Sequence, residues 1–250
     1  TRVAASHIRV GTFQYFAARG DTVALQALLD HVIARHYPEA MGPAQLLKVV
    51  MRRQAKLIAH WMSLGFIHGV MNTDNVQIAG ETIDYGPCAF MDIYHPQRVF
   101  SSIDRGGRYA YGNQPVITQW NLARFAETLI PLIDDDADRA VETAEALIKS
   151  HTERYAQRWL VMMRGKLGLF GEEDGDAALA ADLLDWMARH DADHTNTFRD
   201  LIGGATPPGE PFQNDEFGDW HRRWQARLGR NGKAEEDAWA LMGRHNPAVI

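Results

Sequence analysis

Three oxygen-bearing side chains lie close together in the middle of the sequence. Asp74 and Asn75 are adjacent and precede a short apolar segment, and Asp84 follows nine residues after Asn75. Carboxylate and amide oxygens suit a hard divalent cation that also holds the phosphates of a nucleotide. The alternative is that all three residues only form turns, as Asp and Asn commonly do in loops. The short motif alone leaves both interpretations open.

The segments around these residues predict a loop, a hairpin and a second loop. Val76–Ile78 and Thr82–Ile83 are rich in β-branched residues and predict two short strands, with Gly80 at the turn between them. Upstream, an apolar stripe that starts at Pro43 predicts a long helix ending at Gly65. We expect this helix to lead the chain directly into the first loop.

The residues after this helix resemble the catalytic loop of protein kinases followed by their metal-binding loop. The spacing from His68 to Asn75 matches that from the kinase histidine to the metal-binding asparagine. Two residues after the histidine, where kinases carry the aspartate that acts as base, this chain has Val70. Valine cannot accept a proton, but Asp74 offers a carboxylate beside Asn75. We therefore expect the base at Asp74, and we expect His68 to brace the loop.

Longer segments carry a more specific resemblance. They are Thr1–Phe13, Phe66–Asn75, Thr82–Pro87, Gly107–Tyr111, Asn113–Pro115 and Trp120–Leu122. In this order, over at least residues 1–133, they look like the selenoprotein O family, also called YdiU or UPF0061.

The resemblance implies a kinase-like protein that transfers AMP from ATP to Ser, Thr or Tyr hydroxyls of other proteins, with Mg²⁺ or Mn²⁺ as cofactor. It implies Asp74 as the proton acceptor, Asn75 and Asp84 as metal ligands, and Arg2, Arg9 and Asp84 as nucleotide-binding residues. Ordinary phosphotransfer from ATP and a non-catalytic, nucleotide-binding pseudokinase scaffold are the alternatives.

The two arginines also have a spacing that bears on phosphate binding. Arg2 and Arg9 are seven residues apart, which on a helix is about two turns and would place both guanidinium groups on one face. There they could clamp phosphate oxygens or form surface ion pairs. The spacing alone favours surface ion pairs. The resemblance reverses this preference, because Arg2 and Arg9 fall at the positions of two nucleotide-binding arginines of the family.

The periodicity of apolar residues predicts a mainly α-helical fold with a small β-hairpin, a kinase-like large lobe followed by a helical C-terminal extension. We expect residues 1–133 to form the catalytic core and residues 134–250 to form the extension packed on it. Trp120 is expected to anchor the core, in a helix over residues 119–133. Asp134–Asp136 is expected to cap the next helix, with an acidic metal site as the alternative. Trp220, Trp224 and Trp239 are expected to dock the region that follows the glycine-rich linker at residues 203–209.

Bulk composition excludes several classes of protein. A net charge of −6 argues against a nucleic-acid-binding surface, which needs a basic footprint. The single cysteine, Cys88, excludes an internal disulfide, and no apolar run reaches the roughly 18 residues of a membrane-spanning helix. We therefore expect a cytoplasmic protein; the resemblance implies a mitochondrial location in eukaryotic relatives. Because Thr1 is not an initiator methionine, we also expect a piece of a longer protein, and the resemblance implies an N-terminal small lobe before it and further residues after it.

Overall fold

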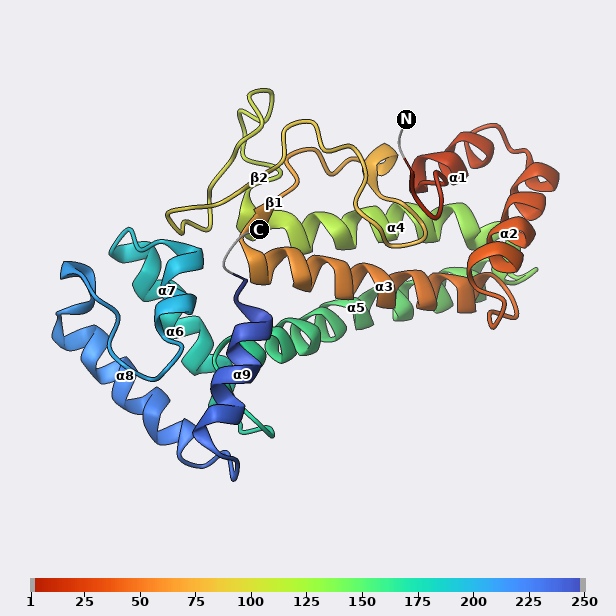
Figure 1. Ribbon diagram of the computed structural model, residues 1–250. Coiled ribbons are helices and arrows are strands. Elements are labelled where there is room, and N and C mark those ends of the chain that lie inside the picture. The colour runs from red at the N-terminus through yellow and green to blue at the C-terminus, as the bar shows by residue number, and fades with distance from the viewer. Residues whose placement is uncertain (1–2, 248–250) are drawn as a thin grey trace.

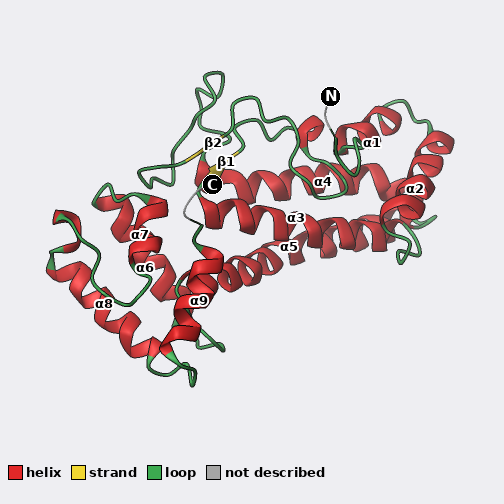
Figure 2. Cartoon of the chain, in the orientation of Figure 1, coloured by secondary structure: helices red, strands yellow, loops and turns green. Residues whose placement is uncertain are grey.

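A computed structural model of the protein describes residues 3–247. As predicted, the fold is mainly α-helical with one small antiparallel sheet (Figures 1 and 2). The helices are α1 (Val10–Ala17), α2 (Thr22–His36), α3 (Pro43–Leu64), α4 (Gln114–Ile133), α5 (Ala137–Lys166), α6 (Asp176–Arg189), α7 (His194–Asp200), α8 (Asp215–Leu228) and α9 (Glu235–His245). The strands are β1 (Phe66–Ile67) and β2 (Ala89–Phe90), and short 3₁₀ turns cover Thr73–Asn75, Tyr111–Asn113 and Glu210–Phe212. No helix within residues 3–247 combines the length and apolar character needed to cross a membrane.

Three long helices form the body of the molecule. Helices α3, α4 and α5 run side by side, with α1 and α2 at one end and α6 to α9 at the other (Figure 1). Helix α3 starts at Pro43, which needs no amide partner in the first turn, and ends where Gly65 adopts a left-handed conformation with φ of 71°. Helix α5 is continuous over 30 residues, or about 45 Å at 1.5 Å per residue. Asp136 caps it, as predicted, by accepting hydrogen bonds from the amides of Asp138 and Arg139.

Two clusters of buried apolar side chains hold these elements together. One cluster joins α1, α2, the first half of α3 and α4, and includes Phe13, Leu46 and Phe125. The other joins the second half of α3 to β1, α6 and α8, and includes Trp186 and Trp220. Because α3 contributes to both clusters, its position is fixed along its whole length. That position in turn fixes where β1 and the loop after it begin.

The small sheet is not formed by the segments that the sequence suggested. Val76–Ile78 and Thr82–Ile83 do not pair with each other. Instead, Phe66 pairs with Phe90 and Ile67 with Ala89, across a long loop. The backbone around Val76–Ile78 pairs instead with the N-terminal segment. The Val10 amide donates to the Val76 carbonyl, and the Ile78 amide donates to the Ile8 carbonyl, both at 3.0 Å. The hairpin prediction was wrong because the better partner lies almost 70 residues away in the sequence.

Trp120 is a second correction. Its side chain is 40% exposed, so it does not anchor the core. Helix α4 begins at Gln114, before the expected start, and Trp120 lies on its outer face between two cations. The guanidinium carbons of Arg108 and Arg124 lie 4.8 Å and 5.4 Å from its ring, an arrangement that stabilises a partly exposed indole.

The tryptophans after the linker behave as predicted. Trp220 and Trp224 are buried, and their indole nitrogens donate to the carbonyls of Leu179 and Leu167 at 2.8 Å and 2.9 Å. Trp239 packs on the same cluster. A buried indole with its N–H satisfied contributes apolar area without a desolvation penalty. These contacts hold α8 and α9 against α6 and the end of α5.

Candidate functional site

The first loop of the site starts where α3 ends. His68 follows β1 and is fully buried, stacked on Trp61 at 5.3 Å between ring centroids. Its Nε2 lies 2.7 Å from the Ile83 carbonyl oxygen, so we assign the proton to Nε2. Burial lowers the pKa of His68, which keeps the ring neutral. His68 therefore joins the two loops by a hydrogen bond, as the bracing role requires.

Polar side chains from α4 support the same loop. Gln114 is buried; its carbonyl oxygen accepts from the His68 amide at 3.0 Å, and its amide donates to the Phe66 carbonyl at 2.9 Å. Asn121 donates to the Met71 carbonyl at 2.8 Å. These bonds satisfy backbone groups that would otherwise be buried without partners. They fix the loop backbone on both sides of Val70.

Asp74 and Asn75 lie in a single 3₁₀ turn at the end of this loop. Asn72 begins the turn, and its side chain accepts from the Asp74 amide at 3.0 Å. Asn75 Nδ2 donates to the Val70 carbonyl at 3.0 Å. The side-chain nitrogen of Asn75 therefore holds the loop. The side-chain oxygen of Asn75 has no hydrogen bond within residues 3–247 and is suited to be a metal ligand.

Arg9 reaches this turn from the N-terminal segment. Its Nη1 donates to the Asp74 carbonyl at 3.2 Å, and its backbone forms a β-bridge with Gln77. Residues 3–9 are not helical, and Arg9 has extended backbone angles before the start of α1. The prediction of a helix face shared with Arg2 was therefore wrong for residues 3–9, since this segment pairs with the loop instead. Arg2 itself lies outside the described residues.

Asp84 directly follows Ile83, whose carbonyl accepts the hydrogen bond from His68. Its φ is 58°, a left-handed conformation that is uncommon for a residue with a side chain and that Asp tolerates better than most. Its negative charge also acts to raise the pKa of His68, against the larger effect of burial. The hydrogen bond to Ile83 and the sharp backbone turn together set the position of the Asp84 carboxylate.

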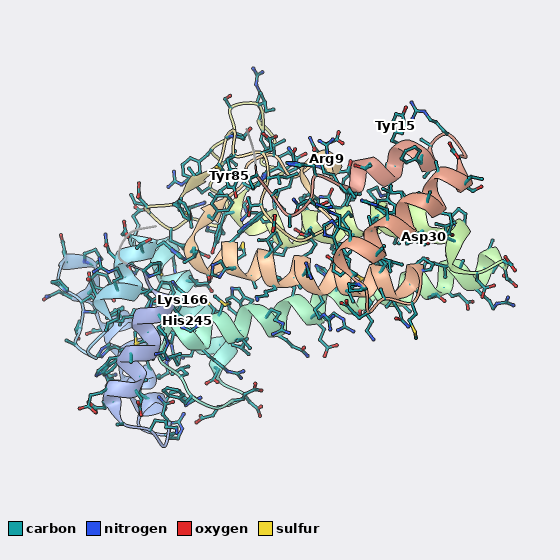
Figure 3. The ribbon with its side chains drawn as sticks, turned by 45° about the vertical axis from the view of Figure 1, so that its right-hand side comes forward. Arg9, Tyr15, Asp30, Tyr85, Lys166 and His245 are labelled. Carbon is teal, nitrogen blue, oxygen red and sulfur yellow. The ribbon has the colours of Figure 1, made fainter. Side chains whose placement is uncertain are left out.

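All four described site residues line one cavity of about 870 Å³. The lining residues include Arg9, Asp74, Asn75 and Asp84, together with His7, Glu81 and Tyr85. Figure 3 shows the labelled Arg9 and Tyr85 on the side of the molecule that carries the loops. A volume of this size is within the range of small-molecule sites, about 300–1,000 Å³.

The lining residues fit a divalent cation held together with a phosphate ligand. Asn75 and Asp84 offer hard oxygen atoms in one cavity. Within residues 3–247, no group of three or more His, Cys, Asp or Glu side chains could hold a metal ion without other ligands. This incomplete set is typical of sites at which Mg²⁺ keeps water and phosphate oxygens as its remaining ligands.

Gly11 is a site residue that the sequence did not reveal. A Cβ atom at this position of α1 would lie 2.1 Å from Asp74 Oδ1. Any other residue here would force the Asp74 carboxylate to move. The separation of 63 residues along the sequence explains why no local pattern could predict this contact.

The helical body positions two loops whose carboxylate and amide side chains, together with Arg9, line one polar cavity. The family model described as "Protein adenylyltransferase SelO" matches residues 1–250, and the chain belongs to this family. The resemblance found in the sequence is thereby confirmed.

Curated bacterial relatives agree with this assignment. The chain is 58% identical to a protein named "Protein nucleotidyltransferase YdiU" from Alcanivorax borkumensis, 56% identical to one so named from Halalkalibacterium halodurans, and 54% identical to one from Nitrosococcus oceani. Each match covers 100% of this chain and 52% of the relative. The chain thus spans about half the length of the curated relatives it matches.

Proposed function

We propose that this chain provides the nucleotide- and metal-binding part of a protein adenylyltransferase, which moves AMP from ATP to Ser, Thr or Tyr hydroxyls of other proteins. The observation that carries the proposal is that Arg9, Asp74, Asn75 and Asp84 line one cavity. Family membership and the names of the relatives support the reaction class.

The proposed reaction is a displacement at the α-phosphorus of ATP. The acceptor hydroxyl oxygen forms a bond to the α-phosphorus, the bond from that phosphorus to the bridging oxygen of the β-phosphate breaks, and pyrophosphate leaves. Asp74 takes the proton of the hydroxyl. Its carboxylate is suited to this because the loop bonds of Asn72 and Arg9 go to backbone atoms of Asp74 and leave the side-chain oxygens unused within residues 3–247.

The remaining roles follow from charge. Asn75 and Asp84 would hold Mg²⁺ or Mn²⁺, which when bound neutralises phosphate charge. Arg9 provides a guanidinium whose Nε is buried and has no partner within residues 3–247, and we assign it to the phosphates, together with Arg2. A buried donor without a partner is costly, so an anion beside Arg9 would remove a penalty that the protein otherwise carries.

The proposed function divides the chain into two parts. We propose residues 1–133 as the kinase-like catalytic core and residues 134–250 as a helical extension packed on it. The packing of α5 along α3 and α4 supports such an arrangement.

Labelled ATP separates the candidate functions. With the full-length protein, and in parallel with the full-length Alcanivorax borkumensis relative, we expect label from the α-phosphate to appear on protein and label from the γ-phosphate not to appear. Transfer of the γ-label would establish phosphotransfer instead. Nucleotide binding without transfer of either label by the full-length protein would establish a scaffold.

The Asp84→Asn substitution tests the metal site. Asn also tolerates the left-handed conformation at this position, so the change removes charge with little effect on the backbone. We expect α-label transfer to fall by at least about 100-fold, because the variant loses the negative charge that would hold a phosphate-neutralising ion. Asp92→Asn, at an exposed position outside the cavity, is the matched control. Unchanged transfer by the Asp84 variant would refute the assignment.

A further inference from the structure

A second hollow lies between α3 and α5, and it shares no lining residue with the first cavity. Its volume is about 410 Å³. In Figure 1, α5 lies on the opposite side of α3 and α4 from the loops that carry Asp74 and Asp84. The hollow is lined by Arg52, Ala55, Arg154, Gln157, Arg158, Leu160, Val161, Arg164 and Glu172.

The lining contains four arginines and a single acid, although the chain as a whole has a net charge of −6. Arg164 is neutralised, since its guanidinium bonds Asp176 at 2.7 Å and Glu172 at 3.2 Å. Arg52 and Arg158 form no ion pair within residues 3–247. Arg154 donates only to the neutral hydroxyl of Ser150, at 3.2 Å.

Three uncompensated cations therefore face one concave surface. Arg154 and Arg158 are four residues apart on one helix, so their like charges destabilise α5 unless an anion lies between them. An exposed solvated face would be expected to spread such charges or to pair them with acids, as the chain does at Arg139 with Asp134 and at Arg223 with Asp182. The gathering of the cations over a hollow points to a ligand.

The walls of the hollow favour a compact anion over water. Ala55, Leu160 and Val161 line the hollow beside the guanidinium groups, so part of its wall offers water no side-chain hydrogen bond. Gln157 also lines the hollow, and its Nε2 donates to Glu153 Oε1 at 3.2 Å. Guanidinium groups bind phosphate oxygens through two parallel hydrogen bonds, which an ammonium group cannot do.

We propose that this hollow, bounded by Arg52, Arg154 and Arg158, is a second anion site that binds a small ligand carrying two or more phosphate groups. Three separate guanidinium groups match more oxygens than one phosphate presents, and the volume exceeds what one phosphate fills. Pyrophosphate and a nucleoside triphosphate share this chemistry. Occupation of the site does not depend on the reaction proposed for the first cavity.

Binding of sodium pyrophosphate, measured by titration calorimetry without divalent cations, tests the site. The double variant Arg52→Gln and Arg158→Gln is compared with Arg105→Gln and Arg199→Gln, which removes the same charge at two other exposed positions without ion pairs. We expect at least about tenfold weaker binding by the first variant and less than about twofold weakening by the second, because each charge-assisted hydrogen bond contributes substantially. All four positions are exposed, so both proteins should fold; circular dichroism checks this.

Further arms identify the ligand. Inorganic phosphate should bind more weakly than pyrophosphate. A variant with Arg158→Lys should bind pyrophosphate more tightly than one with Arg158→Gln but less tightly than the unmodified chain, because lysine keeps the charge but not the forked geometry. Loss of ATP binding in the double variant, in parallel with pyrophosphate, would make a nucleotide the ligand; loss of pyrophosphate binding alone would make it a free oligophosphate.

Four results would overturn the proposal. The first is that the unmodified chain does not bind pyrophosphate, and the second is that both double variants bind it equally weakly. The third is that Arg9→Gln, and not the double variant at the hollow, abolishes pyrophosphate binding. The fourth is that an oligoglutamate peptide binds more tightly than pyrophosphate. The third result would locate the anion in the first cavity, and the fourth would make the hollow a docking surface for acidic protein segments.

Discussion

Lys166, at the end of α5, makes the stability of this protein depend on pH in a predictable way. Its side chain is 2% exposed, at the end of the molecule remote from Asp30 of α2 (Figure 3). It has no carboxylate partner within residues 3–247, and Nζ lies 4.1 Å from the ring centroid of Phe198. Burial lowers the pKa of Lys166 to about 7. The lysine is therefore half-neutral in the folded protein near pH 7 and fully charged when the chain unfolds.

The free-energy cost follows from this difference. One pKa unit corresponds to about 1.4 kcal/mol, so burying this amine lowers the free energy of unfolding at pH 7 by about 4 kcal/mol. The Phe198 ring offsets part of the cost, by about 1–2 kcal/mol, because its face attracts the cation. Between pH 7 and about 10 the unfolded chain binds more protons than the folded one, so stability must rise with pH. From pH 7 to pH 9 we expect a gain of about 1–2 kcal/mol.

Urea denaturation of the unmodified chain and of Lys166→Met, at pH 7 and at pH 9, measures this effect. Methionine keeps the unbranched shape and removes the amine. We expect the variant to be more stable at pH 7, by about 2–3 kcal/mol, and to lose the gain between the two pH values. Lys233→Met, at an exposed position, should behave like the unmodified chain. Parallel pH dependence in Lys166→Met and the unmodified chain would show that Lys166 stays charged in the fold and would refute the reasoning.

Three further predictions concern the site and the extension. Asp74→Ala should lower the rate of AMP transfer by about 100-fold with little change in nucleotide affinity, as expected for a general base. Gly11→Ala should displace the Asp74 carboxylate and lower the same rate by about 10- to 100-fold, whereas Gly243→Ala, where an added Cβ meets nothing within 4 Å, should leave it unchanged. Asp176→Ala should cost about 3–5 kcal/mol in urea denaturation, because it removes the buried carboxylate that accepts hydrogen bonds from both Arg164 and Arg227, whereas Asp182→Ala at the surface should cost less than about 1 kcal/mol.

The outcomes that contradict these predictions are specific. A loss of affinity with an unchanged rate would remove Asp74 as the base, and full activity of Gly11→Ala would show that the carboxylate has room to move. For Asp176, burial alone would raise the pKa, but hydrogen bonds from Arg227, the Glu173 amide and Arg164 outweigh it and lower the pKa. Its contribution to stability is therefore present above pH 4 and lost as pH falls through the lowered pKa. If Asp176→Asn and the unmodified chain lost the same free energy of unfolding on acidification, this pairing would be contradicted.

Local sequence predicted the elements whose signals are local. Helix α3 has a proline at its start, a glycine at its end and a continuous apolar stripe between them, and it was found where expected. Helix α2 likewise begins at a local signal, the cap at Asp21, which accepts a hydrogen bond from the Ala24 amide. The grouping of Asp74, Asn75 and Asp84 was predicted because kinase-type spacing implies one site, and these residues do line one cavity.

Contacts between distant segments could not be predicted in this way. The residues around Val76–Ile78 have a strand-like composition, but their partner, Ile8–Val10, was not evident from spacing. The same contact makes Arg9 extended, against the expected helix face. Trp120 was expected inside because of its size, whereas two flanking arginines stabilise it at the surface. In the first two cases a partner distant in the sequence decided the outcome, whereas the arginines beside Trp120 are only four and twelve residues away and were overlooked.

The continuity of α3 and α5 through both apolar clusters has a consequence for motion. Val50 and Ala144 lie in one cluster, and Ile58 and Met163 lie in the other. Amide hydrogens in the middle of both helices should therefore exchange with solvent only when the whole protein opens, whereas those of residues 79–88, with few backbone bonds, should exchange through local opening. The loop that carries Asp84 would thus rearrange on a faster timescale than the helices beneath it, and a nucleotide could enter and leave without disturbing the body of the protein.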